Sequence, residues 1–360
     1  MNAPWAPVFS IERSGVPEVV IYGALSVVEG RPNTTKTNSL LAVGDTAFDL
    51  WTRSLLKPWQ FLGHLEIVRA AYPDLKNDHL ALMMASHSGE AQHEHLLNEI
   101  MSITGVGEDK LKCPAAYPYS AERRRKLKDA GAPERRLYHN CSGKHLGYLS
   151  AIKSRGGNLE AYLEPEGPHF TPTVQMLNAL TQRAEKKLPE TVDGCQLPNY
   201  AVTVRQMSEL YCGLATAEST PDDVTELLIS SGFTVDSYCR IRDLMHEFPS
   251  VIGGTDRLDT KIMSGLLGLK GAPIVIAKEG ADGMLAIGVG PTTEYPSGLG
   301  VLIKLSSGFD DKYMQLIAGE IFAQLGLRSH DSDVPSQPEG TRTDHLKYKF
   351  QFQVGVKQNV

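Results

Sequence analysis

Apolar and polar positions follow two kinds of pattern along the chain. Residues 18–29 and 39–45 are rich in β-branched and aliphatic residues around a turn cluster, which predicts an N-terminal β-hairpin. Residues 273–278, 284–289 and 299–305 have the same character with short turns between them, which predicts an antiparallel meander. Between these regions the apolar spacing is helical. The expected helices are 58–71, 91–103, 145–154, 172–187, 206–217 and 222–231, and one more at about 310–325.

The order of strands, helices and strands predicts the fold class. The economical arrangement is α+β, with one antiparallel sheet made from the N- and C-terminal strands and a large helical insertion packed beside it. We expect a sheet-containing part from 1–57 and 251–328, a helical part from 58–250, and a tail from 329–360. Residues 345–356 alternate like an edge strand, so the tail is expected to be either mobile or docked. Chemistry is expected in the cleft between the sheet and the helical part.

Composition limits the class of protein. The chain has 360 residues, of which 41% are hydrophobic and 22% charged, and its formal net charge is -6. This acidic balance argues against a nucleic-acid partner. No apolar run is long enough for a membrane span, and the start of the chain does not resemble a secretory signal. The five cysteines do not form a disulfide framework, so a cytoplasmic location is expected.

An S-x-x-K pattern, Ser54 to Lys57, precedes the first predicted helix. Residues three apart share a helix face, so the hydroxyl and the amine can meet. An amine kept neutral by burial or by a nearby cation can activate the hydroxyl as a nucleophile. The alternative is a helix-cap serine and a solvated lysine, and the same pattern recurs by chance at Ser150 and Lys153.

A second serine-containing turn, SHSGE, follows an apolar segment that looks buried. If Ser86 lies near Ser54, it can relay protons or hold a substrate oxygen. Ser88 is expected to cap the next helix, with Glu90 favourable in the first turn. His87 is either a general base or a polar turn histidine.

Two polar loops, HNCSGKH and DGC, contain groups that bind metals. Two thiolates, a carboxylate and a nitrogen would make a tetrahedral zinc site. Lysine is a poor nitrogen ligand because it must first lose its proton. The alternative is a pair of buried structural cysteines with a surface lysine. The candidate ligands are Cys141, Cys195, Asp193 and either His139 or His145, with Lys144 as the poorer source of nitrogen.

Two further cations are candidates for the cleft. Lys278 ends a late predicted strand, and it is either an exposed turn lysine or a cation that anchors a carboxylate or keeps the Ser-Lys amine neutral. Arg53, beside the S-x-x-K pattern, is either a substrate-binding cation or a solvated side chain.

The motifs SLLK, SHSGE, HNCSGKH and DGCQLPNY, in this order, resemble the rhizobial-type (class 3) L-asparaginases of the asparaginase II family. The resemblance spans about residues 15–325. It implies a serine β-lactamase-like fold, in agreement with the predicted order of strands and helices. It also implies an amidohydrolase that converts L-asparagine to L-aspartate and ammonia, and a homodimer.

The resemblance assigns roles to particular residues. It makes Ser54 the expected nucleophile, Lys57 its base, and Ser86 with Lys278 a second Ser-Lys pair. Lys261 competes with Lys278, whose match depends on strand order and on K-E-G standing where β-lactamase-like enzymes carry K-[ST]-G. One zinc ion is expected to aid substrate binding without being strictly required. Its implied ligands are Cys141, Lys144, Asp193 and Cys195, in place of the histidine preferred from spacing, and the expected substrate-binding residues are Arg53, His139 and Asn140.

Other functions are compatible with the same motifs. A β-lactamase or penicillin-binding type of serine hydrolase, or a glutaminase, would use the same kind of nucleophile. An amino-acid sensor stabilised by zinc would keep the pocket without catalysis. The sensor is less favoured, because it would be free to lose Ser54 or Lys57, and both are present.

Overall fold

The computed structural model describes residues 3–32, 34–164, 167, 169–181, 188–220, 222–230, 232–328 and 346–355. The chain divides into two compact units. The first unit comprises Met1–Leu50, Thr203–Thr216 and Gly265–Val360, and the second comprises Trp51–Val202 and Ala217–Ser264. Within the described ranges, no helix has the length and apolar character needed to cross a membrane.

An antiparallel sheet organises the first unit. Its strand order is β10-β1-β2-β9-β8-β7, with β3 paired to β2. Strand β2 pairs antiparallel with β9, so strands from both ends of the chain share one sheet, and β7, β8 and β9 form the predicted meander. These pairings confirm the predicted α+β class. The strands are β1 (Ala6–Arg13), β2 (Val16–Arg31), β3 (Thr34–Val43), β7 (Val275–Gly280), β8 (Met284–Val289), β9 (Leu299–Leu305) and β10 (Leu346–Phe350).

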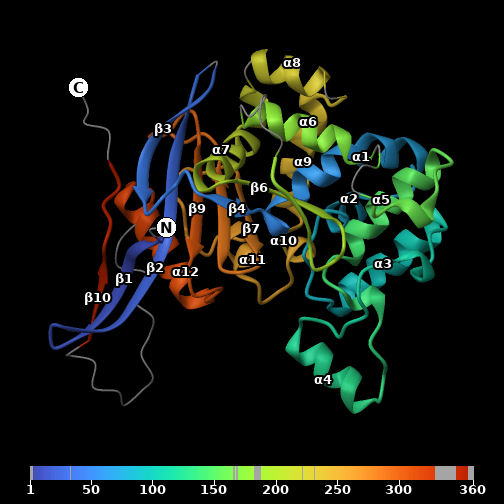
Figure 1. The fold of residues 1–360 in the computed structure, drawn as a ribbon, viewed down its shortest axis with the longest axis horizontal. Helices are drawn as coiled ribbons and strands as arrows, with labels where there is room; N and C mark the ends of the chain where they lie inside the picture. Colours follow the sequence, from blue (N-terminus) through green and yellow to red (C-terminus); the bar gives the residue numbers. More distant parts are fainter. Residues whose placement is uncertain are drawn as a thin grey trace. The chain divides into compact units, whose positions relative to one another are not determined.

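Two helices belong with this sheet, α7 (Val204–Ala215) and α12 (Asp311–Gln324). The apolar pattern places α7 in the helical part, but it packs on β2, β8 and β9 of the first unit. Figure 1 shows α7 beside the strands of this sheet. Gly300 explains the close packing, because a Cβ atom there would lie 1.9 Å from the carbonyl oxygen of Ser208 on α7. The Ser208 hydroxyl also lies 2.8 Å from that of Ser26 on β2, which adds a buried hydrogen bond. The amphipathic pattern of α7 predicts the helix correctly but not the surface on which it packs.

The first strand and the last strand of the sheet lie next to each other. Strand β1, which the sequence pattern does not predict, pairs with β2 and with β10. The ring of Phe9 on β1 stacks on Tyr348 of β10 at 5.6 Å and lies 5.2 Å from Phe350. Part of the predicted tail is therefore an edge strand, whereas residues 329–345 and 356–360 lie outside the described residues.

The second unit is mainly helical. Helix α5 is its most buried element, because every residue from Ser142 to Ile152 is buried, and α1 packs against it (Figure 1). The predicted helix 172–187 ends at Leu180, and residues 182–187 lie outside the described part. Strands β5 (Glu190–Val192) and β6 (Pro198–Thr203) pair antiparallel, and β4 (Asp49–Trp51) lies where the chain enters this unit. The α-helices are α1 (Lys57–Ala71), α2 (Asn77–Leu82), α3 (Ala91–Thr104), α4 (Ala121–Asp129), α5 (Ser142–Ser154), α6 (Thr171–Leu180), α8 (Asp222–Ser230), α9 (Val235–Glu247), α10 (Pro249–Ile252) and α11 (Leu258–Met263). The 3-10 turns are η1 (Arg53–Leu56), η2 (Glu108–Lys110), η3 (Arg136–Tyr138), η4 (Leu159–Ala161) and η5 (Ala217–Ser219).

Candidate active site

Ser54 lies on the short turn η1, directly before α1. The preceding residue, Arg53, has a φ of 46°, in the left-handed region that side chains other than glycine disfavour. The backbone N–H of Lys57 donates to the carbonyl of Ser54, and Pro58 occupies the first turn of α1. Ser54 is half-buried and Lys57 fully buried. The turn therefore holds the partly accessible hydroxyl of Ser54 close in the chain to Lys57, whose side chain is buried.

The amine of Lys57 contacts the SHSGE segment. Its Nζ donates to the carbonyl of Ala85 at 2.6 Å and lies 2.7 Å from the Ser86 Oγ. A lysine is almost never fully buried unless its amine has such partners. The predicted alternative of a solvated helix-end lysine is therefore wrong. The structure joins Ser86 to the S-x-x-K segment through Lys57.

The SHSGE segment has no regular secondary structure and is held on both sides by backbone hydrogen bonds. The N–H groups of Ser86 and Ser88 donate to the carbonyls of Ile252 and Gly253, at 2.9 and 2.7 Å. The N–H of His87 donates to the carbonyl of Asn140 at 3.2 Å. Ser88 does not cap the next helix, contrary to the prediction, because the N-cap of α3 is Glu90, which forms a capping box with His93.

His87 has a structural role in place of the general-base role considered from sequence. Its Nδ1 accepts the N–H of Gly89 at 3.2 Å, which assigns the proton to Nε2, and Nε2 lies 2.9 Å from the Ser142 hydroxyl. That hydroxyl in turn donates to the carbonyl of Leu137 at 2.9 Å. Burial and the neighbouring His93 and Lys57 keep the pKa of His87 well below its ordinary value. Both ring nitrogens are engaged, so His87 holds the loop behind Ser86.

The two thiols of the predicted metal site lie against each other. Cys141 is the N-cap of α5, and Cys195 lies in the turn between β5 and β6. The hydrogen bond from Cys195, with the neighbouring Lys57 and Lys144, holds the pKa of Cys141 well below its ordinary value. The same hydrogen bond and burial raise the pKa of Cys195 well above its ordinary value. The N–H of His87, next to Ser86, donates to the carbonyl of Asn140, next to Cys141, so the Ser-Lys segment and the thiols lie near each other.

Lys144 projects from the first turn of α5 toward this sulfur pair and is buried, not at the surface. Burial lowers the pKa of Lys144, but the charges of Cys195, Cys141 and Asp193 together raise it above its ordinary value. The charges of these groups therefore favour the ammonium form of Lys144 when no metal is bound.

The donor types of this cluster match those of a tetrahedral zinc site, namely two sulfurs, a nitrogen and an oxygen. The carboxylate has other partners, because the Asp193 Oδ1 accepts from the Arg53 Nε and from the Gly194 N–H, both at 2.8 Å. Only Oδ2 is then left for a metal. Among the described residues, no group of three or more His, Cys, Asp and Glu side chains is arranged to hold a metal. The donor types fit a zinc site. The Asp193 carboxylate is the ligand least well placed for it, because one of its oxygens already accepts two hydrogen bonds.

The predicted substrate-binding residues contact the candidate metal ligands. The side chain of Arg53 is 29% exposed and is paired with Asp193, so it is not simply solvated. His139 and Asn140 are half-buried and directly precede Cys141. The N–H of Cys141 donates to the Nδ1 of His139 at 3.1 Å, which fixes the orientation of that ring. These side chains have the accessibility that contact with a small substrate requires.

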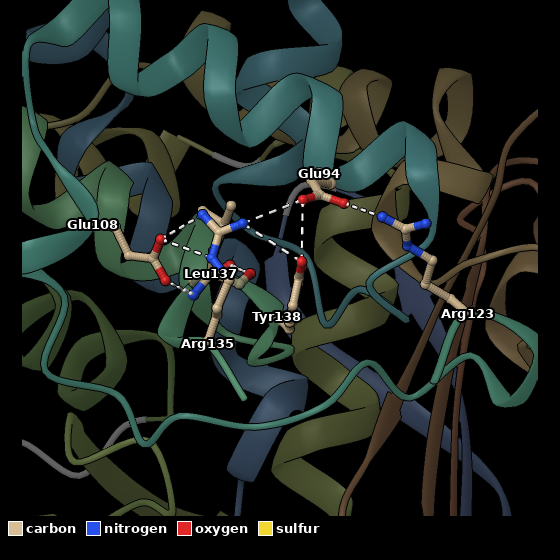
Figure 2. Close-up of polar contacts among 7 residues, drawn as sticks. Glu94, Glu108, Arg123, Arg135, Leu137 and Tyr138 are labelled. Atoms are coloured by element: carbon tan, nitrogen blue, oxygen red, sulfur yellow. Dashed lines mark hydrogen bonds and ion pairs between the residues drawn. The ribbon is translucent and has the colours of Figure 1, made fainter. Parts of the chain in front are cut away.

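A network of charged side chains holds the segment that leads into His139 (Figure 2). Arg135 donates to Glu108 at 2.6 Å and to Glu94 on α3 at 3.4 Å. Glu108 also accepts the N–H of Leu137 at 3.0 Å, and Glu94 accepts from the hydroxyl of Tyr138 at 3.3 Å and from Arg123 at 2.6 Å. Burial raises the pKa of Glu108, but Arg135 and the Leu137 N–H together hold it below its ordinary value. The turn η3 is thereby attached to α3.

The two candidates for the second lysine differ in burial and in location. Lys278 is fully buried on β7 of the first unit, and Lys261 is exposed on α11 of the second. The predicted alternative of an exposed turn lysine is therefore wrong for Lys278. A buried amine is the more typical environment for a catalytic lysine, which favours Lys278 over Lys261.

The chance recurrence of S-x-x-K has a structural explanation. The Nζ of Lys153 donates to the carbonyls of Thr104 and Gly105, at 3.0 and 2.7 Å. This lysine therefore caps the C-terminal end of α3. The motif at Ser150 carries no sign of a nucleophile.

Two residues beside the site are missing from the sequence-based candidates. The amide of Asn199 binds the backbone of Arg53, and an Nη1 of Arg257 lies 3.4 Å from the carbonyl of Ser86. Asn199 stands within the motif DGCQLPNY, so the sequence marks its position. The sequence does not show that its side chain binds the backbone of Arg53. Arg257 follows the glycine-containing segment 251–256.

Comparisons with known proteins agree with the sequence motifs. The family model described as L-asparaginase II matches residues 9–357. A search of curated proteins finds no significant match. Among solved structures, a Bacillus glutaminase has 14% sequence identity and a TM-score of 0.39, over 85% of this chain and 92% of that chain. A probable glutaminase from Bacillus subtilis in complex with 6-diazo-5-oxo-L-norleucine has 14% identity and a TM-score of 0.40, over 85% of each chain. A β-lactamase from Desulfarculus baarsii has 13% identity and a TM-score of 0.35, over 84% of this chain and 92% of that chain. Scores of this size are too low to carry a functional argument.

Proposed function

The chain belongs to the L-asparaginase II family, and we propose that it hydrolyses the side-chain amide of L-asparagine to give L-aspartate and ammonia. Family membership supports an amidohydrolase that acts on asparagine or glutamine. The observation that carries the proposal further is the fully buried amine of Lys57, 2.7 Å from the Ser86 Oγ and three residues from the half-buried Ser54. Such an amine beside hydroxyls is what a serine amidohydrolase needs.

In the proposed reaction, the Ser54 Oγ attacks the amide carbon while its proton passes to the Lys57 amine. Burial disfavours the charged form of an amine, which is the physical ground for giving Lys57 the role of base. The tetrahedral intermediate collapses with cleavage of the C–N bond. The departing nitrogen takes a proton from Lys57, directly or through the Ser86 hydroxyl, and leaves as ammonia. Water then attacks the ester on Ser54 and gives a proton to Lys57, which passes it to the Ser54 Oγ as the bond to the acyl carbon breaks and aspartate is released.

Zinc is proposed as a resident metal, held by Cys141, Lys144, Asp193 and Cys195. The contact between the two thiols, and the presence of Lys144 and Asp193 beside them, support this donor set. The metal would supply a fixed positive charge for binding the polar groups of an amino acid. In this arrangement Arg53 orients the Asp193 carboxylate, and Arg53, His139 and Asn140 are proposed to contact the substrate. The roles of Lys278, the homodimer and the cytoplasmic location stay predictions from the sequence.

The nucleophile is tested by Ser54→Ala. We expect turnover of L-asparagine to fall by more than about 10³-fold, because loss of a nucleophile leaves only binding and polar stabilisation. The circular dichroism spectrum should be unchanged, because the side chain is only half-buried. Ser150→Ala, in the other S-x-x-K pattern, is the matched control and should keep turnover. Substantial ammonia release by Ser54→Ala would place the nucleophile elsewhere, with Ser86 the next serine to test.

A further inference from the structure

Asn199 is fully buried at the start of β6, opposite the turn that carries Ser54. Its Oδ1 accepts the backbone N–H of Arg53 at 3.2 Å, and its Nδ2 donates to the carbonyl of Arg53 at 3.4 Å. One planar amide thus satisfies both polar backbone groups of a single residue. We name these two hydrogen bonds the Asn199 clamp.

The clamped residue has an unusual backbone. Arg53 has a φ of 46°, a conformation that persists in a residue with a Cβ only when the surroundings impose it. Strain of this kind clusters at functional sites, and Ser54 is the next residue in the chain. The neighbouring Thr52 is held to the same strand, because its N–H and hydroxyl both bond to the carbonyl of Tyr200, at 3.0 and 2.8 Å. The chain is therefore fixed to β6 immediately before Ser54.

The Asn199 clamp also bears on the ion pair between Arg53 and Asp193. The Arg53 side chain, whose direction is set by this backbone, pairs with Asp193 at 2.8 Å. Asp193 stands in the loop between β5 and β6 that carries Cys195. A change at Asn199 would therefore reach both Ser54 and the arginine–aspartate pair.

We propose that Asn199 is a positioning residue, whose amide imposes the left-handed conformation of Arg53 and so aims the Ser54 hydroxyl at the substrate. The inference rests on the proposed function of Ser54 as nucleophile. Only an amide offers a donor and an acceptor in this geometry, so aspartate cannot replace it. Asn199 does not itself react.

The first test compares the cost of Asn199→Ala in three backgrounds. With Arg53 present, and also with Arg53→Ala, the strained φ remains, so Asn199→Ala should lower kcat for L-asparagine about tenfold or more with KM changed less than about threefold. With Arg53→Gly the left-handed conformation carries no steric penalty, so the same change should lower kcat by less than about threefold. Thr173→Val is a matched control at a fully buried polar residue of α6, and it should leave kcat unchanged.

An equal cost of Asn199→Ala in all three backgrounds would overturn the clamp, because a packing role would not depend on the Cβ of residue 53. No cost in any background would overturn it as well. The second measurement does not depend on catalysis, namely hydrogen exchange of the Arg53 amide in the full-length chain. Asn199→Ala should accelerate this exchange at least about tenfold, because the N–H loses its acceptor. An unchanged exchange rate would overturn the clamp even in an active enzyme. Faster exchange in a chain that never releases ammonia would support the clamp and reject the proposed function.

Discussion

At the scale of single residues, the second unit buries several histidines in their neutral form. His64 on α1 is the clearest case, because burial, with smaller contributions from His169 and Arg155, lowers its pKa to about 3. Its Nδ1 and Nε2 have no hydrogen-bond partner among the described residues, and its ring lies 4.4 Å from that of Tyr148. The folded state therefore resists protonation of His64, while the unfolded state accepts a proton near pH 6.5.

This difference predicts sensitivity to acid. Between pH 6.5 and about 3 the unfolded state binds more protons, so stability should fall as pH falls, by about 1.4 kcal/mol per unit for His64. His64→Leu removes the titration, and the variant should lose about 2 kcal/mol less than the parent between pH 6.5 and 5. Urea unfolding at both pH values measures the difference. His95→Leu changes an exposed histidine and is the control. Equal losses for the parent and His64→Leu would contradict the account.

Single side chains also show how far the sequence can predict the site. The residue types and their spacing select Ser54, Lys57, Ser86 and the two thiols, because hydroxyls, amines and thiols are the groups that a nucleophilic or metal site needs. Spacing cannot show that the Lys57 amine points at Ser86, since that contact joins segments 29 residues apart. The sequence also suggests His87 as a general base. In the structure both of its ring nitrogens are engaged in holding a loop.

At the scale of elements, the SHSGE segment depends on the loop beside it, which accepts the N–H groups of Ser86 and Ser88. Gly254 has a φ of 134°, and a Cβ there would lie 2.5 Å from the Ser88 Oγ and 2.8 Å from the Glu90 Oε1. Gly254→Ala should therefore displace the segment that carries Ser86. We expect a loss of about 1–3 kcal/mol in unfolding free energy and a fall in kcat of about tenfold or more.

Gly156→Ala is the matched control for Gly254→Ala. Gly156 also has a positive φ, of 69°, but nothing lies within 4 Å of the position that a Cβ atom would take there. It should show the cost of the positive φ alone, about 1 kcal/mol, with kcat unchanged. Thermal unfolding and asparagine turnover separate the two effects. If both variants lose kcat to the same extent, the contact with Ser88 is not what matters.

The charged network around Arg135 attaches η3 to α3 (Figure 2). Arg135→Met removes the bonds to Glu108, Glu94 and Tyr138, and should cost about 1 kcal/mol, since the groups are partly exposed. The more specific effect is local, namely faster hydrogen exchange of the Leu137 amide and a raised KM, because His139 and Asn140 follow directly. Lys126→Met breaks an exposed pair on α4 and is the control. Unchanged exchange at Leu137 would show that the network does not hold this turn.

The apolar pattern predicts some helices and strands correctly and fails for others. Periodicity finds α1, α3 and α7, and it finds the meander from continuous apolar runs, because β7, β8 and β9 are buried on both faces. It misses β1, whose run of mixed polar and apolar residues gains its partners from β2 and from a strand more than 300 residues later. It finds α7 but places it in the wrong part, because the packing of α7 depends on a small residue, Gly300, on a distant strand.

At the scale of the whole molecule, zinc connects stability to the site. If the metal binds the folded chain alone, zinc at a hundred times its dissociation constant should stabilise it by about 2.7 kcal/mol. Removal of zinc by a chelator should therefore lower Tm, and Cys141→Ser should abolish both bound zinc and this response. Zinc content by mass spectrometry and calorimetric Tm are the measurements.

Cys212→Ser, at a buried thiol on α7 of the first unit, is the control and should keep zinc binding. The proposed metal site would be contradicted if the parent chain, purified in the presence of zinc, contains no zinc and shows no change in Tm when the chelator is added.

The central claim concerns the reaction, and ammonia release by the purified chain tests it most directly. L-asparagine and L-glutamine are supplied in parallel, with zinc present and folding verified. The account predicts fast release from asparagine and little from glutamine. Release from glutamine alone would show that the chain is an amidohydrolase but that its substrate is glutamine and not asparagine. The absence of release from both would contradict the account, and would leave a β-lactam-type hydrolase or an amino-acid sensor as the functions to test.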